Sequence, residues 1–100
     1  MRPVIDSIRV SGVSYAVNYK SSTEMGSRLG LADFNGQEIS INRDSTAQTK
    51  KIALWHETLH ILSHAYGIDL SEAQVQMLTH AIVALTEDNF GIVEQFKECQ

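Results

Sequence analysis

The residues of this sequence that most clearly suggest chemistry are His56-Glu57-Thr58-Leu59-His60, which fit the pattern H-E-x-x-H. In an α-helix, residues four apart are separated by about 40° around the axis and about 6 Å along it. His56 and His60 would therefore project from one face and reach the same metal ion. Glu57 would lie beside them, close enough to act as a general base on a water molecule. Two imidazoles, a neighbouring carboxylate and room for water describe a hydrolytic zinc site.

The sequence around this pentapeptide predicts a helix that can present it. Ser45-Thr46-Ala47-Gln48 is a capping-box sequence, no Pro or Gly follows before Gly67, and Gly67 is a typical C-terminal stop. The expected apolar stripe of this helix consists of Ile52, Trp55, Leu59, Leu62 and Tyr66. The histidine pair falls on the flank of that stripe, so a metal site there would face a cleft beside the core. This context favours a metal site over a coincidental His and Glu pattern on an exposed helix.

Composition and charge are those of a soluble globular domain that spans residues 1–100, with 43% hydrophobic and 20% charged residues. The net charge is −4 and only Lys50-Lys51 places two basic residues together, so we expect no nucleic-acid partner. No apolar run approaches the length of about 20 residues that spans a bilayer, and Met1–Val10 does not look like a signal peptide. The single cysteine, Cys99, suits a reducing compartment. We therefore expect a cytoplasmic protein without a membrane partner.

The first half of the chain predicts a small β-sheet. Residues 13–19 alternate strictly between apolar and polar side chains, which is typical of a half-buried strand. Ser11-Gly12 and Asn35-Gly36 are tight-turn sequences, and each is flanked by alternating segments that predict a hairpin. The expected strands cover roughly residues 8–10, 13–19, 29–31 and 38–42, with a polar loop over 20–26. Hairpins of this kind predict mainly antiparallel pairing.

The second half of the chain predicts helices. Ser71-Glu72-Ala73-Gln74 is a second capping-box sequence, and the helix that it begins fades at Asp88-Asn89. Its expected apolar stripe consists of Val75, Leu78, Ile82 and Leu85. Phe90–Glu98 has the apolar spacing of a short terminal helix. The predicted fold is therefore α+β, with a small antiparallel sheet of about four strands followed by the H-E-x-x-H helix and a second packed helix.

With these elements in place, the chain resembles the zincin metallopeptidases, specifically the minimal members of the ImmA/IrrE type and related phage or mobile-element proteins. Residues 56–64 resemble that family's H-E-x-x-H-x-x-x-H helix, and residues 72–78 resemble its following helix, where a Glu supplies a metal ligand. The segment 38–42 corresponds to the strand beside a zincin cleft. The resemblance covers about residues 37–89. It implies a Zn²⁺ cofactor, Glu72 as the third ligand and a regulatory protein as substrate.

Catalytic zinc usually takes three protein ligands, and the residues leave the third one open. Glu72 is supported by the resemblance, although acidic residues are common in the first turn of any helix. His80 is its rival, because in a simple antiparallel helix pair it falls level with the metal; a steep helix crossing would instead favour Glu72. His64 continues the row of His56 and His60, but it lies about 9 Å along the axis from their midpoint, which suits a metal ligand less well.

The leading functional hypothesis is a zinc metallopeptidase in which Glu57 is the catalytic base and a protein or peptide is the substrate. The strand at 38–42 is expected to pair with an extended substrate. His64, Tyr66 and His80 are candidates for stabilising the oxyanion. The alternative is a zincin-like module that binds metal and a partner protein with little or no turnover, and a third is an interaction domain without metal. The sequence determines neither the substrate, the cleavage preference nor the oligomeric state.

Overall fold

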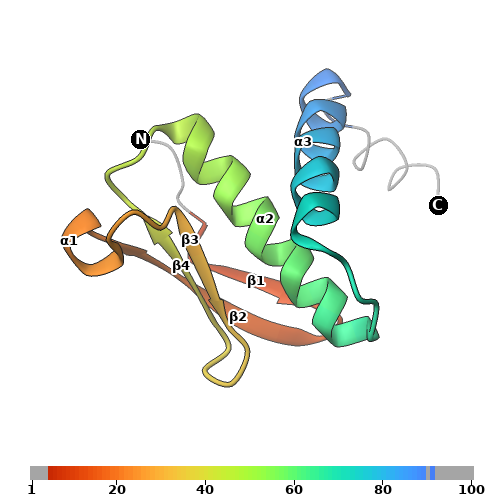
Figure 1. Ribbon diagram of the computed structural model, residues 1–100, viewed down its shortest axis with the longest axis horizontal. Coiled ribbons are helices and arrows are strands. Elements are labelled where there is room, and N and C mark those ends of the chain that lie inside the picture. The colour runs from red at the N-terminus through yellow and green to blue at the C-terminus, as the bar shows by residue number, and fades with distance from the viewer. Residues whose placement is uncertain (1–4, 90, 92–100) are drawn as a thin grey trace.

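A four-stranded sheet with a long helix across one face forms the fold, and a second helix packs against the first (Figure 1). The computed structural model describes residues 5–89 and 91. The strands are β1 (Ser7–Val10), β2 (Val13–Lys20), β3 (Gly30–Asp33) and β4 (Glu38–Asn42). The helices are the short α1 (Ser22–Met25), then α2 (Ala47–Tyr66) and α3 (Glu72–Asp88). The predicted α+β class is confirmed, as is the order of four strands followed by two long helices, whereas α1 lies in the segment 20–26, where a loop is expected.

The sheet is mixed, with the strand order β1-β2-β4-β3. The pairs β1–β2 and β3–β4 are antiparallel as expected, whereas the central pair β2–β4 is parallel, with Val17 opposite Ile39. The parallel pair arises because the chain leaves β2 through α1 and returns as β3 at the far edge of the sheet, which leaves β4 to fill the space between them. The alternation of apolar and polar residues does not indicate where in the sheet each strand lies.

The position of β4 corrects one functional expectation. Because β4 pairs with β2 on one side and β3 on the other, it has no free edge for a substrate. Its residues Ile39 and Ile41 are fully buried, as befits a central strand. The edge strands are β1 and β3, and β3 is the one that follows β4 at its end of the sheet. The prediction that segment 38–42 pairs with a substrate is therefore wrong, because the strand with an unpaired edge on this side of the sheet is β3.

One predicted turn and one predicted helix cap are confirmed, and a second helix cap differs from the prediction. Ser11 and Gly12 have φ angles of 50° and 84° and close the β1–β2 hairpin, as predicted. The capping box at Ser71 is also confirmed, with the Gln74 N–H donating to the Ser71 hydroxyl at 3.1 Å and the Gln74 side chain accepting from the Ser71 N–H at 2.9 Å. Helix α2, however, is capped by Thr46, because the Ser45 hydroxyl donates to the carbonyl of Asn42 instead.

The main core lies between the sheet and α2. Its buried members are Val10, Tyr15, Val17, Ile39, Ile41, Ala53 and Ile61. Of the predicted α2 stripe, Leu59 is buried, whereas Tyr66 is 63% exposed and its hydroxyl forms a hydrogen bond with that of Ser11. The helix turns a slightly different face to the sheet than the stripe implied, because small Ala53 also packs inward.

Helix α3 buries a different row from the predicted one. Val75, Thr79 and Val83 are its buried residues, whereas Leu78 and Leu85 from the predicted stripe are 36% and 57% exposed. Thr79 can be fully buried because its hydroxyl donates to the carbonyl of Val75 at 2.7 Å. A pattern that counts Thr as polar cannot reveal this row.

Helix α3 ends at Asp88, as predicted, and the terminal helix expected over Phe90–Glu98 lies outside the described residues. None of the helices within the described part of the chain has the length and apolarity needed to cross a membrane.

The buried side chain of Asn42 connects the segment before β3 to the segment before α2. Its amide nitrogen donates to the carbonyl of Arg28 at 3.2 Å. Its side-chain oxygen accepts from the Ser22 hydroxyl at 3.2 Å and from the Asp44 N–H at 3.0 Å. Asn42 is only 5% exposed, so water cannot readily replace these bonds.

We predict that Asn42→Ala lowers the free energy of unfolding by about 1–3 kcal/mol, since it leaves several buried polar groups without partners. Chemical denaturation of the variant measures this loss. The matched control is Asn18→Ala, at an exposed position of β2, which should change stability by less than about 0.5 kcal/mol. Equal stability of the two variants would contradict the structural role of Asn42.

Candidate metal centre

Two successive helices bring three potential metal ligands together at the start of α3. His56 and His60 project from the middle of α2, and Glu72 is the first residue of α3. The Nε2 atoms of the histidines are 3.2 Å apart. The Glu72 carboxylate lies 2.6 Å from His56 Nε2 through Oε1 and 3.2 Å from His60 Nε2 through Oε2. One ligand atom from each residue lies within 4.8 Å of the others, so the three form a compact cluster.

The geometry of this cluster fits a tetrahedral zinc ion. Bonds of about 2.1 Å at tetrahedral angles place ligand atoms about 3.4 Å apart. The histidine nitrogens are 3.2 Å apart, and the two Glu72 oxygens lie 2.6 Å from His56 and 3.2 Å from His60, so small side-chain adjustments would bring one atom of each residue to this spacing. Two His and one Glu form a ligand set that catalytic zinc sites use. The residues present are therefore suited to hold this ion with one position left for water.

The connection between the helices determines why Glu72 joins the histidines. Gly67 adopts the left-handed conformation, with φ of 65°, and ends α2. The Ser63 hydroxyl then bonds with the carbonyl of Ile68, and Ser71 caps the next helix. These interactions reverse the chain within a few residues. Figure 1 shows that α3 crosses α2 at an angle, so the first turn of α3 lies beside the histidines.

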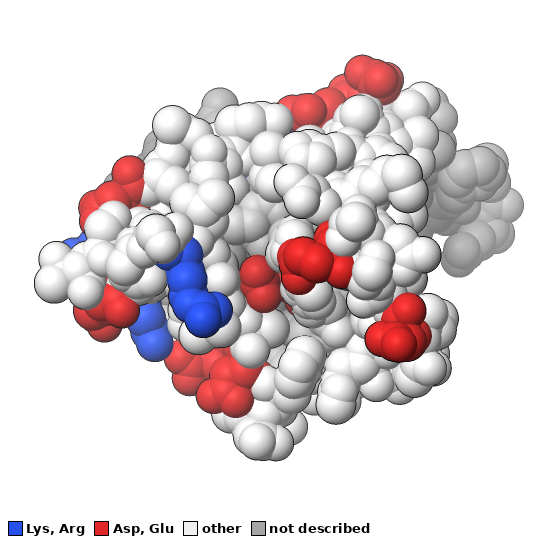
Figure 2. Space-filling model, in the orientation of Figure 1, with Lys and Arg blue, Asp and Glu red and all other residues white. Residues whose placement is uncertain are grey.

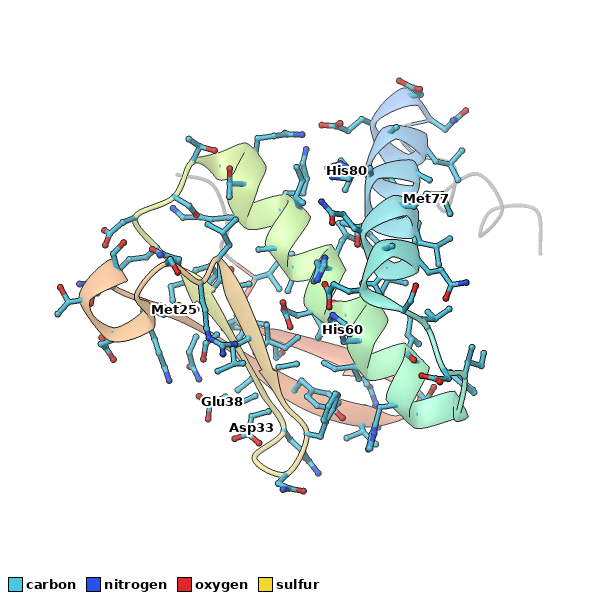
Figure 3. All side chains as sticks on the ribbon, viewed as in Figure 1. Met25, Asp33, Glu38, His60, Met77 and His80 are labelled. Carbon is cyan, nitrogen blue, oxygen red and sulfur yellow. The ribbon has the colours of Figure 1, made fainter. Side chains whose placement is uncertain are left out.

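The other two candidate ligands lie elsewhere. His80 is not part of the cluster, although it lines the cleft together with His56 and Glu57. In Figure 3 its side chain points from α3 toward the side on which α2 lies, whereas Met77 points away. His64 stacks on the ring of Phe34, with centroids 4.3 Å apart and an interplanar angle of 16°. Phe34 also lines the part of the cleft that holds the cluster.

Glu57 lies beside the cluster and faces strand β3. Burial, together with the nearby charge of Glu72, raises the pKa of Glu57; the charges of His56 and His60 and a hydrogen bond from the Ala32 N–H oppose that rise. A carboxylate whose conjugate acid has a raised pKa is a stronger base, which is the direction of change that general base chemistry needs.

Gly30 makes room for Glu57. A Cβ atom at this position would lie 3.0 Å from the Cγ atom of Glu57 and 3.2 Å from Oε2, closer than ordinary packing allows. The backbone of β3 can therefore approach the carboxylate only because residue 30 has no side chain.

The free edge of β3 forms one wall of the cleft. The Asn42 N–H donates to the carbonyl of Leu29 at 3.0 Å, and residues in an antiparallel pair alternate in direction along the strand. Gly30 and Ala32 therefore turn their backbone N–H and C=O groups away from β4. The hydrogen bond from Ala32 to Glu57 agrees with this direction. Nothing in the sequence indicates that β3, and not another strand, lies beside the site.

No family model, no curated protein and no solved structure matches this chain. The interpretation of the site accordingly rests on the chemistry of its residues and on their arrangement. Together these define an α+β protein with a His-His-Glu cluster beside a partly buried carboxylate and a free strand edge.

We predict that the protein purified under zinc-replete conditions holds about one zinc ion per chain, because the three ligand atoms already converge. Glu72→Ala should weaken zinc affinity by at least about 100-fold, since losing even an outer partner of a ligand costs 10–100-fold. His80→Ala is the matched control and should retain the wild-type affinity. Elemental analysis and competition with a chelator measure both quantities. A wild-type content below about 0.1 zinc per chain, or a larger loss from His80→Ala, would contradict this ligand set.

Proposed function

We propose that this protein is a zinc-dependent metallopeptidase of the minimal zincin type that hydrolyses peptide bonds in an extended protein segment. One observation carries the proposal: the His56, His60 and Glu72 cluster lies next to a partly buried Glu57, in a cleft bounded by a free strand edge. A binding site for metal alone would not need the additional carboxylate, whose burial costs free energy.

Each residue of the site has a separate task. His56, His60 and Glu72 would hold Zn²⁺, and the ion, when bound, supplies a Lewis acid that polarises the scissile carbonyl and makes water easier to deprotonate. Glu57 accepts the proton of the attacking water and passes it to the leaving amine. The Ala32 N–H and the space left by Gly30 hold the carboxylate of Glu57 in place for both transfers.

The free edge of β3 provides the means of binding substrate. The backbone groups of Gly30 and the carbonyl of Ala32 can pair with an extended chain, which yields affinity without a deep pocket. This mode suits a domain of 100 residues with limited surface for a specificity pocket. The zincin resemblance suggests a regulatory protein as the substrate, and the single cysteine suits the cytoplasm as its compartment.

We predict that Glu57→Gln retains zinc and loses peptide cleavage by at least about 100-fold, since general base catalysis commonly contributes 10²–10⁴-fold. Incubation of the zinc-loaded proteins with a proteome-derived peptide mixture, followed by mass spectrometry of new termini, measures the loss. If wild type and variant gave the same products, or no products beyond background, the protein would be a zincin-like binding module instead.

Gly30→Ala tests the close approach of β3 to Glu57. We expect the added methyl group to displace the carboxylate and lower kcat/KM about 10–100-fold, because a shift of about 1 Å at a catalytic group has effects of this size. Zinc content and thermal stability should change little, since the ligands do not contact this position. Unchanged kcat/KM would show that Glu57 does not act from its place beside Gly30.

A further inference from the structure

Arg28 lies immediately before β3 and lines the same part of the cleft as His56, His60, Glu57 and Glu72. Both polar groups of its backbone are held in place. Its carbonyl accepts from the buried amide of Asn42 at 3.2 Å, and its N–H donates to the carbonyl of Met25 at 3.2 Å. The base of the side chain is therefore positioned by the fold, at the point where the chain enters the edge strand.

The charge of Arg28 is not used within the described residues. Two lysines on other surfaces form ion pairs, Lys20 with Glu38 at 3.7 Å and Lys51 with Glu87 at 2.5 Å. Across residues 5–89, the guanidinium of Arg28 has no carboxylate partner, even though it shares a cleft with Glu57 and Glu72. Figure 2 shows basic side chains on this face beside the acidic groups at its centre.

Charge balance makes this guanidinium important for a ligand. A divalent ion held by the cluster would balance the negative charges of Glu57 and Glu72. Among the described residues that line the two parts of the cleft around Glu57, Arg28 would then be the remaining charged group, and no other Lys or Arg lines them. Asp69 lines the adjoining part of the cleft beyond His60. Arg28 is an exposed residue at the rim of this part of the cleft, and a planar guanidinium is well suited to bind a carboxylate through two parallel hydrogen bonds.

We propose that Arg28 makes the cleft selective for peptides that carry a carboxylate on the C-terminal side of the scissile bond. This inference rests on the proposed peptidase function and specifies its substrate class. Glu57 lies at Gly30, two residues beyond Arg28, or about 7 Å along a strand. A substrate paired antiparallel to β3 places the residues that follow the scissile bond toward Arg28. The carboxylate therefore belongs to an Asp or Glu one or two residues after the bond, or to the chain terminus.

The first test uses matched synthetic peptides based on a sequence that the wild-type protein cleaves in the proteome-derived mixture. One pair has Glu or Gln after the scissile bond, and a second pair ends there in a free acid or an amide. We expect kcat/KM to be about three- to tenfold higher with a carboxylate, as for a partly exposed ion pair, and this ratio should fall as salt rises. The two pairs distinguish a side-chain carboxylate from a terminal one.

Arg28→Gln should abolish the preference, whereas Arg9→Gln should retain it. Arg9 is an exposed residue of β1, at the opposite edge of the sheet, so this control changes the net charge equally. Equal rates for acid and amide in the wild type would overturn the inference, and so would an unchanged preference in Arg28→Gln. Thermal unfolding of both variants checks that each is folded.

A second measurement does not depend on turnover. Calorimetry compares the binding of glutaric acid monohydroxamate, and of the same compound with a terminal carboxamide, to the zinc-loaded protein. We expect the acid to bind about three- to tenfold more tightly to wild type and no more tightly to Arg28→Gln. Preference here without peptide cleavage would refute the peptidase function and leave the carboxylate site standing. Cleavage without preference would refute only the role of Arg28, and a failure to bind zinc would overturn both.

Discussion

The packing of α2 against the sheet is the constraint on which the site depends. Ala53 and Ile61 are buried against β-strand residues, and these contacts fix the rotation of the helix about its axis. Because a helix repeats every 3.6 residues, fixing the buried face also fixes where His56 and His60 point. The histidines are consequently half-buried, with side chains 22% and 29% exposed, at the boundary between core and cleft. A substitution that rotated α2 would therefore displace both the core residues and the two histidines.

The remaining parts of the site are placed by two chain reversals of different origin. The turn after Gly67 uses a left-handed residue, a Ser63 hydroxyl and the Ser71 capping box, and it delivers Glu72 to the histidines. The reversal after β2 places β3 at the sheet edge, where Asn42 holds the entering segment by its backbone. One reversal thus completes the cluster of candidate metal ligands, and the other provides the opposite wall of the cleft. Both reversals depend on a few hydrogen bonds and contribute little to the apolar core. Fewer packing interactions therefore hold the walls of the cleft in place than hold α2.

The sequence predicted those features that depend on local chemistry. The H-E-x-x-H helix, the Ser11-Gly12 hairpin and the capping box at Ser71 follow from residue types within a few positions of one another. The parallel β2–β4 pair was not predictable in this way, since it depends on where a crossover lands in the sheet. For the same reason, the choice between Glu72 and His80 required the crossing angle of two helices. The buried row of α3 was missed because Thr79 satisfies its hydroxyl within its own helix.

The electrostatics of the cleft follow from this arrangement. Glu57 and Glu72 are two carboxylates in one partly enclosed space, and desolvation with the charge of Glu72 raises the pKa of Glu57. The imidazoles of His56 and His60 offset part of that effect, and the Ala32 N–H offsets another part. A cleft that concentrates negative charge in a chain of net charge −4 favours a cation at its centre. If a bound ion balanced that charge, Arg28 at the entrance to β3 would be the remaining charged group in this part of the cleft, and the charge of a ligand beside the ion would then affect its binding.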